Sequence, residues 1–228
     1  MAQRELSGII FDFNGVIIDD YLLQKESWSQ MAQILRGRPV TDDEMVHRIR
    51  GVPSKDTIVW LSTKALNSVE IKAFVQRKTN IIHDLFETSP LLQLATGLPT
   101  FLDELTVQNI ARTIATSQTH EAFSYLFDKL DLAQWFDKEL VVCFDGTYPG
   151  KPAPDAYILA AHSIRLEPKA CVVVEDAASG IAAAWAAGVQ SIVVVGRTEH
   201  LQEFSLLPGV TKAIHNFSEI HAHDLFSS

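Results

Sequence analysis

Short apolar runs, each followed by polar or turn-forming residues, recur along this chain and constrain its fold more than any other feature. They occupy residues 8–11, 113–115, 140–143, 171–174 and 191–195. The apolar residues in each run are continuous rather than alternating, which is typical of strands buried on both faces of a parallel sheet. Helical patterns separate the later runs, so we predict an α/β fold with a doubly wound parallel sheet. Residues 213–228 are expected to add an edge strand and a frayed tail.

One long segment, residues 20–92, breaks this alternation, because it has helical patterns throughout and no strand-like run. A helical stretch of this length after the first strand indicates a small, all-helical cap domain inserted into the sheet domain. We therefore predict a core formed by residues 1–19 and 93–228 and a cap formed by residues 20–92. Trp28 and Trp60 are interpreted as part of the core of the cap rather than as ligand-stacking residues.

The composition excludes several classes of protein. The chain has 228 residues, of which 47% are hydrophobic and 21% charged, and its formal net charge is −9. These values are unlike those of disordered chains, and no basic stripe indicates a nucleic-acid partner. No apolar stretch reaches the roughly 20 residues that span a bilayer, and the first residues do not read as a signal peptide. Both cysteines, Cys143 and Cys171, lie in apolar runs and are interpreted as buried thiols.

We expect a cytoplasmic protein that is a monomer or a weak homo-oligomer and has no nucleic-acid or membrane partner.

Polar residues follow four of the expected strands, where a parallel sheet gathers its functional groups. They are Asp12 after the first run, Thr116 and Ser117 after the second, Lys151 after the third, and Glu175 with Asp176 after the fourth. Taken singly, each is typical of a helix cap, a turn or a solvated loop. Together they suit phosphoryl transfer, because a carboxylate can attack phosphorus while hydroxyl, amide and lysine groups offset charge on the transferring oxygens. Carboxylate oxygens also suit Mg²⁺.

Four segments carry a resemblance to a known family: FDFNGVIIDD from residue 11, TIATS from residue 113, GKPAPD from residue 150 and VVVEDAASGIAAAWAAG from residue 172. They resemble the four motifs of the haloacid dehalogenase superfamily. The resemblance is closest to the β-phosphoglucomutase-like branch, in which a helical cap follows the first motif. It covers nearly the whole chain and implies a Mg²⁺-dependent enzyme that forms an aspartyl-phosphate.

This resemblance implies a role for each motif residue. Asp12 is expected to be the nucleophile, Thr116 with the amide of Ser117 to hold the phosphate, and Lys151 to balance charge between the two. The expected ligands of Mg²⁺ are Asp12, the main-chain carbonyl of Asn14, Asp176, and Glu175 either directly or through water.

Asn14 departs from the family pattern, which has a second aspartate at this position as the general acid and base. An asparagine amide has no usable proton equilibrium near neutral pH. The loss of the aspartate should therefore cost about 10²- to 10⁴-fold in rate. Asp20 is an additional carboxylate near the start of the predicted cap. Our hypothesis is that Asp20 takes over the acid and base role. The alternative is that Asp19 and Asp20 cap the first cap helix.

Substrate selection is expected to depend on the cap. Residues 48–55 resemble the family's specificity loop, and Gly51, Ser54 and Lys55 within it, together with Gln24, are the expected substrate contacts. The alternative for Lys55 is an exposed lysine at a helix start. The mutase has an arginine where this chain has Ser54 and a histidine where it has Gln24, and both differences weaken a sugar-phosphate mutase interpretation.

The sequence thus favours a Mg²⁺-dependent phosphatase that acts on a small phosphorylated metabolite. Two alternatives remain: a sugar-phosphate mutase, and a catalytically impaired protein that binds a phosphorylated metabolite. Dehalogenation is disfavoured, because the true dehalogenases need no metal, whereas Glu175 and Asp176 form a pair suited to one.

Overall fold

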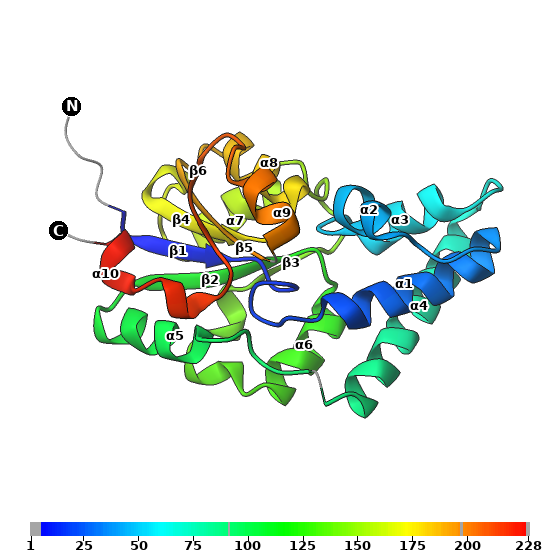
Figure 1. Cartoon of the computed structure of the whole chain (residues 1–228), viewed down its shortest axis with the longest axis horizontal. Coiled ribbons are helices and arrows are strands. Elements are labelled where there is room, and N and C mark those ends of the chain that lie inside the picture. Colours follow the sequence, from blue (N-terminus) through cyan, green and yellow to red (C-terminus); the bar gives the residue numbers. More distant parts are fainter. Residues whose placement is uncertain (1–5, 91, 197, 227–228) are drawn as a thin grey trace.

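A computed structural model describes residues 6–90, 92–196 and 198–226 of the chain. Its centre is a six-stranded, fully parallel sheet with the order β3-β2-β1-β4-β5-β6. The strands are β1 (Gly8–Phe11), β2 (Ala111–Thr116), β3 (Val142–Cys143), β4 (Cys171–Glu175), β5 (Ser191–Val195) and β6 (Val210–Ile214). The predicted doubly wound sheet is confirmed, and the apolar runs supply five of its strands (Figure 1).

Helices cover both faces of the sheet because successive side chains of a strand point to opposite sides. Ile9 and Phe11 of β1 face a core built with α5 (Leu98–Val107) and α6 (His120–Lys129). Ile10 faces the opposite core, built with α7 (Asp155–Ser163), α8 (Ala178–Ala186) and α9 (Thr198–Phe204). The central strand β1 is therefore buried on both faces, and its carboxyl end lies between those of β2 and β4.

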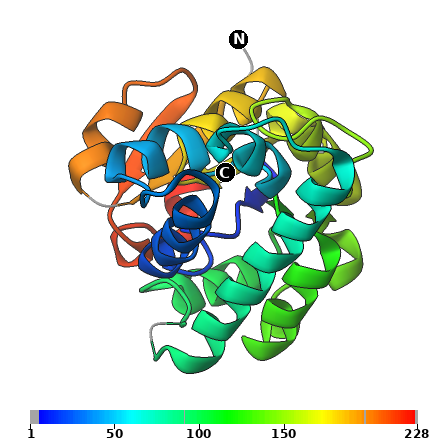
Figure 2. The same cartoon turned by 90° about the vertical axis from the view of Figure 1, so that its right-hand side faces the viewer.

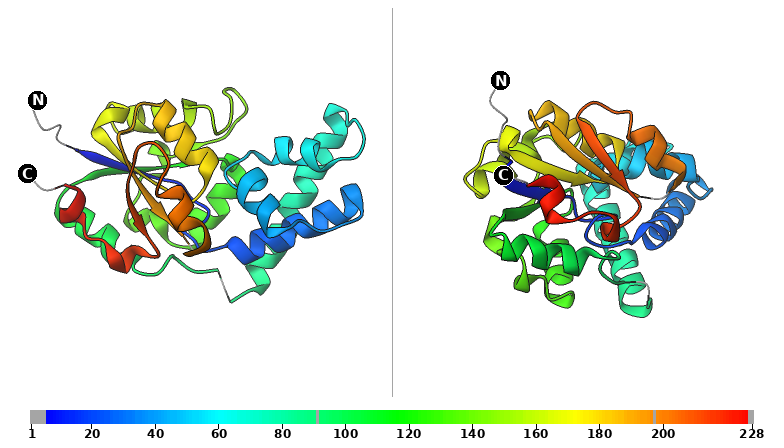
Figure 3. Two further views of the ribbon diagram at one scale, coloured as in Figure 1. Left: turned by 45° about the horizontal axis from the view of Figure 1, so that its top comes forward. Right: turned by 60° about the vertical axis from the view of Figure 1, so that its left-hand side comes forward.

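A helical segment lies between β1 and α5. Its elements are α1 (Tyr21–Arg36), α2 (Asp42–Glu44), a π-helix (Met45–Ile49), α3 (Ser54–Leu61) and α4 (Ser68–Thr88). They share a hydrophobic cluster of their own that includes Trp28, Met31 and Ile58. Figures 2 and 3 show these helices grouped beside the sheet and its flanking helices. Trp28 lies in this cluster as predicted, but the prediction for Trp60 is wrong: it is 41% exposed and lies beneath the guanidinium of Arg36.

The end of the chain is more ordered than the sequence indicated. The edge strand β6 begins at Val210, and a 3₁₀ turn (Phe217–Glu219) and the short helix α10 (Ala222–Leu225) follow it. Phe217 and Ala222 are buried against the same core as Phe11, so apolar packing holds this segment in place of the expected fraying. Residues 227–228 lie outside the described part of the chain.

The third apolar run also differs from its prediction. Only Val142 and Cys143 form a strand, because a 3₁₀ turn (Lys138–Leu140) precedes them and β3 pairs with β2 at two positions only. Other 3₁₀ turns are Leu132–Gln134 and Pro168–Ala170. Cys171 is fully buried as expected, whereas Cys143 on this edge strand is half-buried. Among the described residues, no helix is long and apolar enough to cross a membrane.

Candidate active site

The carboxyl ends of β1 and β4 bring the acidic motif residues together. The backbone amide of Asp12 donates to the carbonyl of Val174 at 2.9 Å, which fixes Asp12 beside the end of β4. Glu175 and Asp176 follow Val174 directly, and all three acidic side chains are buried. Parallel pairing therefore places two segments more than 150 residues apart in sequence at one edge of the sheet.

Lys151 joins two of these carboxylates. Its Nζ lies 2.6 Å from Oδ1 of Asp12, 2.8 Å from Oε1 of Glu175 and 2.9 Å from the hydroxyl of Tyr157. Tyr157 in turn donates to Oε1 of Glu175 at 2.6 Å. Burial alone would lower the pKa of Lys151, but the charges of Asp12 and Glu175 raise it above its ordinary value. The ammonium is therefore a fixed positive charge at the base of the site.

Opposing effects act on the pKa of Asp12. Burial raises its pKa to about 7, while Lys151 opposes this shift and Glu175 adds to it. A carboxylate that is buried but still reached by one cation is a usable nucleophile, because it keeps little solvation to lose on attack.

Carboxylate oxygens of Asp12, Glu175 and Asp176 all lie within 4.8 Å of one another, and this oxygen donor set fits a hard divalent cation. The two oxygens of Glu175 are already occupied. Oε1 accepts from Lys151 and Tyr157, and Oε2 accepts from the backbone amides of Asp176 and Ala177 at 2.8 and 3.0 Å. Asp12 and Asp176 are therefore better placed than Glu175 to bind a metal ion directly.

Gly15 allows this arrangement. Its φ is +79°, and a Cβ atom there would overlap the carboxylate of Asp176. Only glycine both adopts this backbone conformation without strain and leaves that space to the carboxylate.

The predicted phosphate-binding residues lie at the end of β2. Thr116 is buried, and its Oγ1 accepts from the backbone amide of Gln118 at 3.1 Å. Ser117 donates its hydroxyl to the carbonyl of Gly51 at 2.9 Å, so this side chain contacts the helical segment. The hydroxyl of Ser117 is therefore engaged, in line with the prediction that its backbone amide is the phosphate-binding group.

The expected specificity residues meet the sheet edge differently. Gly51 lies against Ser117, which follows β2, and against Ser179 of α8. Lys55 is exposed, with its ammonium 5.1 Å from the ring centre of Phe144. Ser54 begins α3 and is half-buried. Gln24 lies deeper, on α1, where it contacts Asp20.

A chain of hydrogen bonds runs from Asn14 into the helical segment. Nδ2 of Asn14 donates to Oδ2 of Asp20 at 2.5 Å, and Nε2 of Gln24 donates to the same oxygen at 2.7 Å. Lys78 of α4 donates to Oε1 of Gln24 at 2.7 Å, and Gln118 donates to Oδ1 of Asn14 at 2.6 Å. Asp20 occupies the N-cap position of α1, but its side chain makes no capping hydrogen bond. The helix-capping alternative therefore holds for the position of Asp20 but not for its side chain.

Burial governs the ionisable members of this network. Asp20 is 2% exposed, and burial raises its pKa, although the hydrogen bonds from Gln24 and Asn14 oppose the shift. Burial also lowers the pKa of Lys78 to about 8, against the attraction of Asp20. A buried carboxyl with a raised pKa beside the site is suited to proton transfer.

Four residues of this site were not predicted from the sequence: Arg50, Lys78, Gln118 and Tyr157. Arg50 lies directly before Gly51 in the specificity loop, and its guanidinium pairs with the carboxylate of Asp176. Gln118 follows Thr116 and Ser117 directly, so adjacency to a motif is a usable signal for both residues. Lys78 and Tyr157 lie inside helical patterns, where nothing marks a buried polar side chain.

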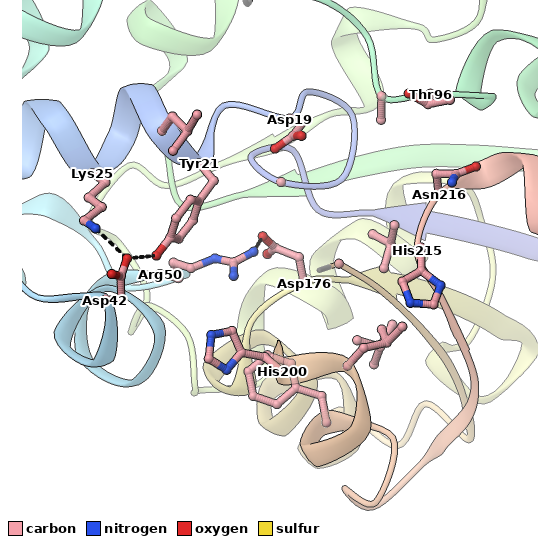
Figure 4. A pocket seen from close by; sticks show the side chains of 18 residues that line it. Asp19, Tyr21, Lys25, Asp42, Arg50, Thr96, Asp176, His200, His215 and Asn216 are labelled. Atoms are coloured by element: carbon pink, nitrogen blue, oxygen red, sulfur yellow. Dashed lines mark hydrogen bonds and ion pairs between the residues drawn. The ribbon is translucent and has the colours of Figure 1, made fainter. Parts of the chain in front are cut away.

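A pocket of about 280 Å³ opens beside the pair formed by Arg50 and Asp176 (Figure 4). Tyr21 and Lys25 of α1 form one side of it, and His200 of α9 faces them from another. The pocket thus lies between the helical segment and the ends of β5 and β6.

Comparison with known proteins is consistent with this geometry. Residues 9–194 match the family model of haloacid dehalogenase-like hydrolases. The chain is 30% identical over 189 residues to a phosphorylated carbohydrates phosphatase of Thermotoga maritima, covering 82% of this chain and 84% of that protein. It is also 30% identical over 189 residues to hexitol phosphatase A of Escherichia coli, covering 82% of each.

A solved structure extends the similarity to nearly the whole fold. A family IA, variant 3 hydrolase of Entamoeba histolytica superposes with a TM-score of 0.86 at 31% identity, covering 97% of this chain and 100% of that one. The matched family model spans three of the six strands completely and most of two others, and it includes every acidic residue of the site.

Proposed function

Because this chain belongs to the haloacid dehalogenase-like hydrolases, in their β-phosphoglucomutase-like branch, we propose that it is a Mg²⁺-dependent phosphatase of small phosphorylated metabolites. One observation carries the proposal: Lys151 bridges Asp12 and Glu175 at the edge of the sheet where Asp176 completes a set of oxygen donors. This arrangement provides a nucleophile, a fixed positive charge and a cation site within one buried cluster.

In this account, a carboxylate oxygen of Asp12 attacks the phosphorus of the substrate. The bond from phosphorus to the leaving oxygen breaks, and an aspartyl-phosphate forms on Asp12. Water then attacks this phosphorus and regenerates the carboxylate, releasing inorganic phosphate. Lys151 and the amide of Ser117 offset the charge on the transferring oxygens. Mg²⁺ held by Asp12, Asp176 and the carbonyl of Asn14 would supply further charge stabilisation.

Asp20 supplies the proton for the leaving oxygen. Asn14 cannot do so, because its amide has no usable proton equilibrium near neutral pH. Both amide hydrogen bonds to Asp20 end on Oδ2, so a proton on this carboxyl group is carried by Oδ1. The protonated form is favoured by burial, which raises the pKa of Asp20. After transfer, the carboxylate of Asp20 can accept a proton from the attacking water.

The names of two relatives support a substrate class. Two relatives are named for phosphorylated carbohydrates and for hexitols, so we propose a phosphorylated sugar or sugar alcohol. Residues 20–92 act as a cap over the core of residues 1–19 and 93–228. We propose that Gln24 and the loop from Gly51 to Lys55 select the leaving group, with Ser54 in place of the arginine expected of a mutase.

The test is release of inorganic phosphate from a panel of sugar and polyol phosphates, with Mg²⁺ and with a chelator. We expect release that requires Mg²⁺ and is abolished in an Asp12→Asn variant. Isomerisation of a sugar phosphate without net release would instead indicate a mutase. Tight binding of a metal-fluoride phosphate mimic without turnover of any compound would indicate a binding protein.

A further inference from the structure

Arg50 places its guanidinium on the carboxylate that the proposed function assigns to the metal. Its Nη2 pairs with Oδ2 of Asp176, and the side chains are 18% and 4% exposed, respectively. The guanidinium belongs to the helical segment, whereas the carboxylate belongs to the sheet edge. This ion pair is therefore a charged contact between the two parts of the site (Figure 4).

The backbone around Arg50 fixes the position of this contact. Ser179 of α8 donates to the carbonyl of Arg50 at 2.9 Å, and Ser117 donates to the carbonyl of Gly51 at 2.9 Å. The guanidinium carbon lies 5.5 Å from the ring centre of Tyr21, which covers its other side. Gly15 leaves room for both partners, because a Cβ there would lie 3.1 Å from Nη2 of Arg50.

The surrounding charges favour a cation at this point. Burial lowers the pKa of Arg50, but the negative charges of Glu175, Asp20 and Asp12 oppose that effect. Either a guanidinium or a divalent metal ion at this point would be stabilised by these negative charges. Both need the carboxylate of Asp176, and its Oδ2 cannot hold the guanidinium and coordinate a metal at full strength.

We propose that Arg50 competes with the divalent cation for Asp176 and thereby couples metal binding to substrate binding. The cation must draw Asp176 away from the guanidinium, so the metal binds more weakly than its donor set alone would allow. The released guanidinium then faces the same cluster in which the phosphate of the substrate binds, and an anionic phosphate gives it a replacement partner. The phosphate therefore favours the state in which the metal is bound.

This inference rests on the proposed metal site but not on turnover, so its test uses metal binding in the absence of substrate. Calorimetric titration of the whole protein with Mg²⁺ is compared among the wild type, Arg50→Met and Arg50→Gln. We expect both variants to bind Mg²⁺ about tenfold more tightly than the wild type. Two substitutions are used because either variant alone can fail to fold.

The matched control is Arg48→Met, which removes an equal charge from an exposed position two residues away. Its Mg²⁺ affinity should equal that of the wild type. A general electrostatic effect would strengthen binding in all three variants alike and would contradict the proposal. Unchanged or weaker binding in both Arg50 variants would also overturn it. If the wild type bound no Mg²⁺ at all, the proposed metal site itself would be wrong.

A second titration tests the coupling. Mg²⁺ affinity is measured with and without saturating inorganic phosphate, and the ratio of the two affinities gives the coupling factor. We expect this factor to be several-fold smaller in Arg50→Met than in the wild type, because the variant has no guanidinium to transfer from Asp176 to phosphate. An equal factor in both proteins would remove Arg50 from the coupling.

Discussion

Nδ2 of Asn14 donates a hydrogen bond of 2.5 Å to Oδ2 of Asp20, six residues along the chain. The amide at the position where the proposed function would otherwise have an aspartate is therefore in contact with a buried carboxyl group. In this contact Asn14 acts as a donor that orients Asp20, while its own oxygen accepts from Gln118. The two side chains together retain one carboxyl group at the site, and the acid that we propose, Asp20, lies one hydrogen bond away from Asn14.

Replacement of Asp20 by asparagine removes that carboxyl group while retaining its size. We expect Asp20→Asn to reduce the rate of phosphate release by about 10²- to 10⁴-fold, the usual contribution of a general acid and base. Asp19→Asn is the matched control, because Asp19 is an exposed neighbour. Steady-state turnover of the best substrate from the panel measures both. Equal turnover in Asp20→Asn and the wild type would rule out Asp20 as the proton donor.

The buried ammonium of Lys78 should leave a signature in the pH dependence of stability. Its pKa is lowered by burial from 10.5 to about 8. Between these values the unfolded chain binds more protons than the folded one, so this group raises the free energy of unfolding as the pH increases, by up to about 1.4 kcal/mol per pH unit. Below pH 8 both states are protonated and the contribution is flat.

A comparison with Lys78→Met isolates this contribution, since methionine does not titrate. We expect the free energy of unfolding of the wild type to rise relative to that of the variant from pH 8 to pH 10. Urea denaturation at unit steps of pH measures it. Parallel curves for the two proteins would show that Lys78 has an ordinary pKa in the folded state.

Gly15 and Gly37 offer a matched pair of glycines, with φ values of +79° and +76°. Alanine at either position should cost about 1 kcal/mol or more of stability from the left-handed conformation alone. Only at Gly15 would the new Cβ overlap the carboxylate of Asp176, whereas nothing lies within 4 Å of the corresponding point at Gly37. We therefore expect Gly15→Ala, but not Gly37→Ala, to lose Mg²⁺ affinity. Calorimetric titration of the two folded variants decides this, and equal affinities would contradict the geometry.

Tyr157 stabilises the charged base of the site through its hydroxyl. Burial raises the pKa of Tyr157 well above its ordinary value, so the hydroxyl stays protonated. It donates a hydrogen bond to Glu175. Tyr157→Phe should lower the free energy of unfolding by about 1.5–3 kcal/mol, as expected for a hydrogen bond to a charged group. Urea denaturation measures this loss. A loss below about 0.5 kcal/mol would indicate that Lys151 is a sufficient hydrogen-bond partner for Oε1 of Glu175.

The sheet and the acidic edge of the site were predictable because they depend on local patterns. Continuous apolar runs mark buried parallel strands. Asp12 follows the first run directly, and Glu175 with Asp176 follows the fourth. Parallel strands must end at the same edge, so their proximity follows from topology alone. The length of β3 was overestimated, because an edge strand with only two paired positions leaves little signal in the sequence.

The contacts made by the helical segment were not predictable in the same way. Lys78 lies on α4, more than 50 residues from Gln24, and only the packing of α4 against α1 brings them together. Arg50 was placed near the site by its neighbour Gly51, but its pairing with Asp176 depends on how the loop meets α8. Such contacts arise from tertiary packing, which residue spacing does not encode.

We propose that the proton donor is the carboxyl group at position 20 rather than one at position 14, and an exchange of the two side chains distinguishes these positions. The double variant Asn14→Asp with Asp20→Asn restores the family's aspartate and keeps one carboxyl group and one amide in contact. The measurement is its rate of phosphate release beside that of Asp20→Asn alone. We expect the double variant to recover to within about tenfold of the wild type, whereas the single variant should remain about 10²- to 10⁴-fold slower. Full activity in Asp20→Asn alone, or no recovery in a folded double variant, would contradict it.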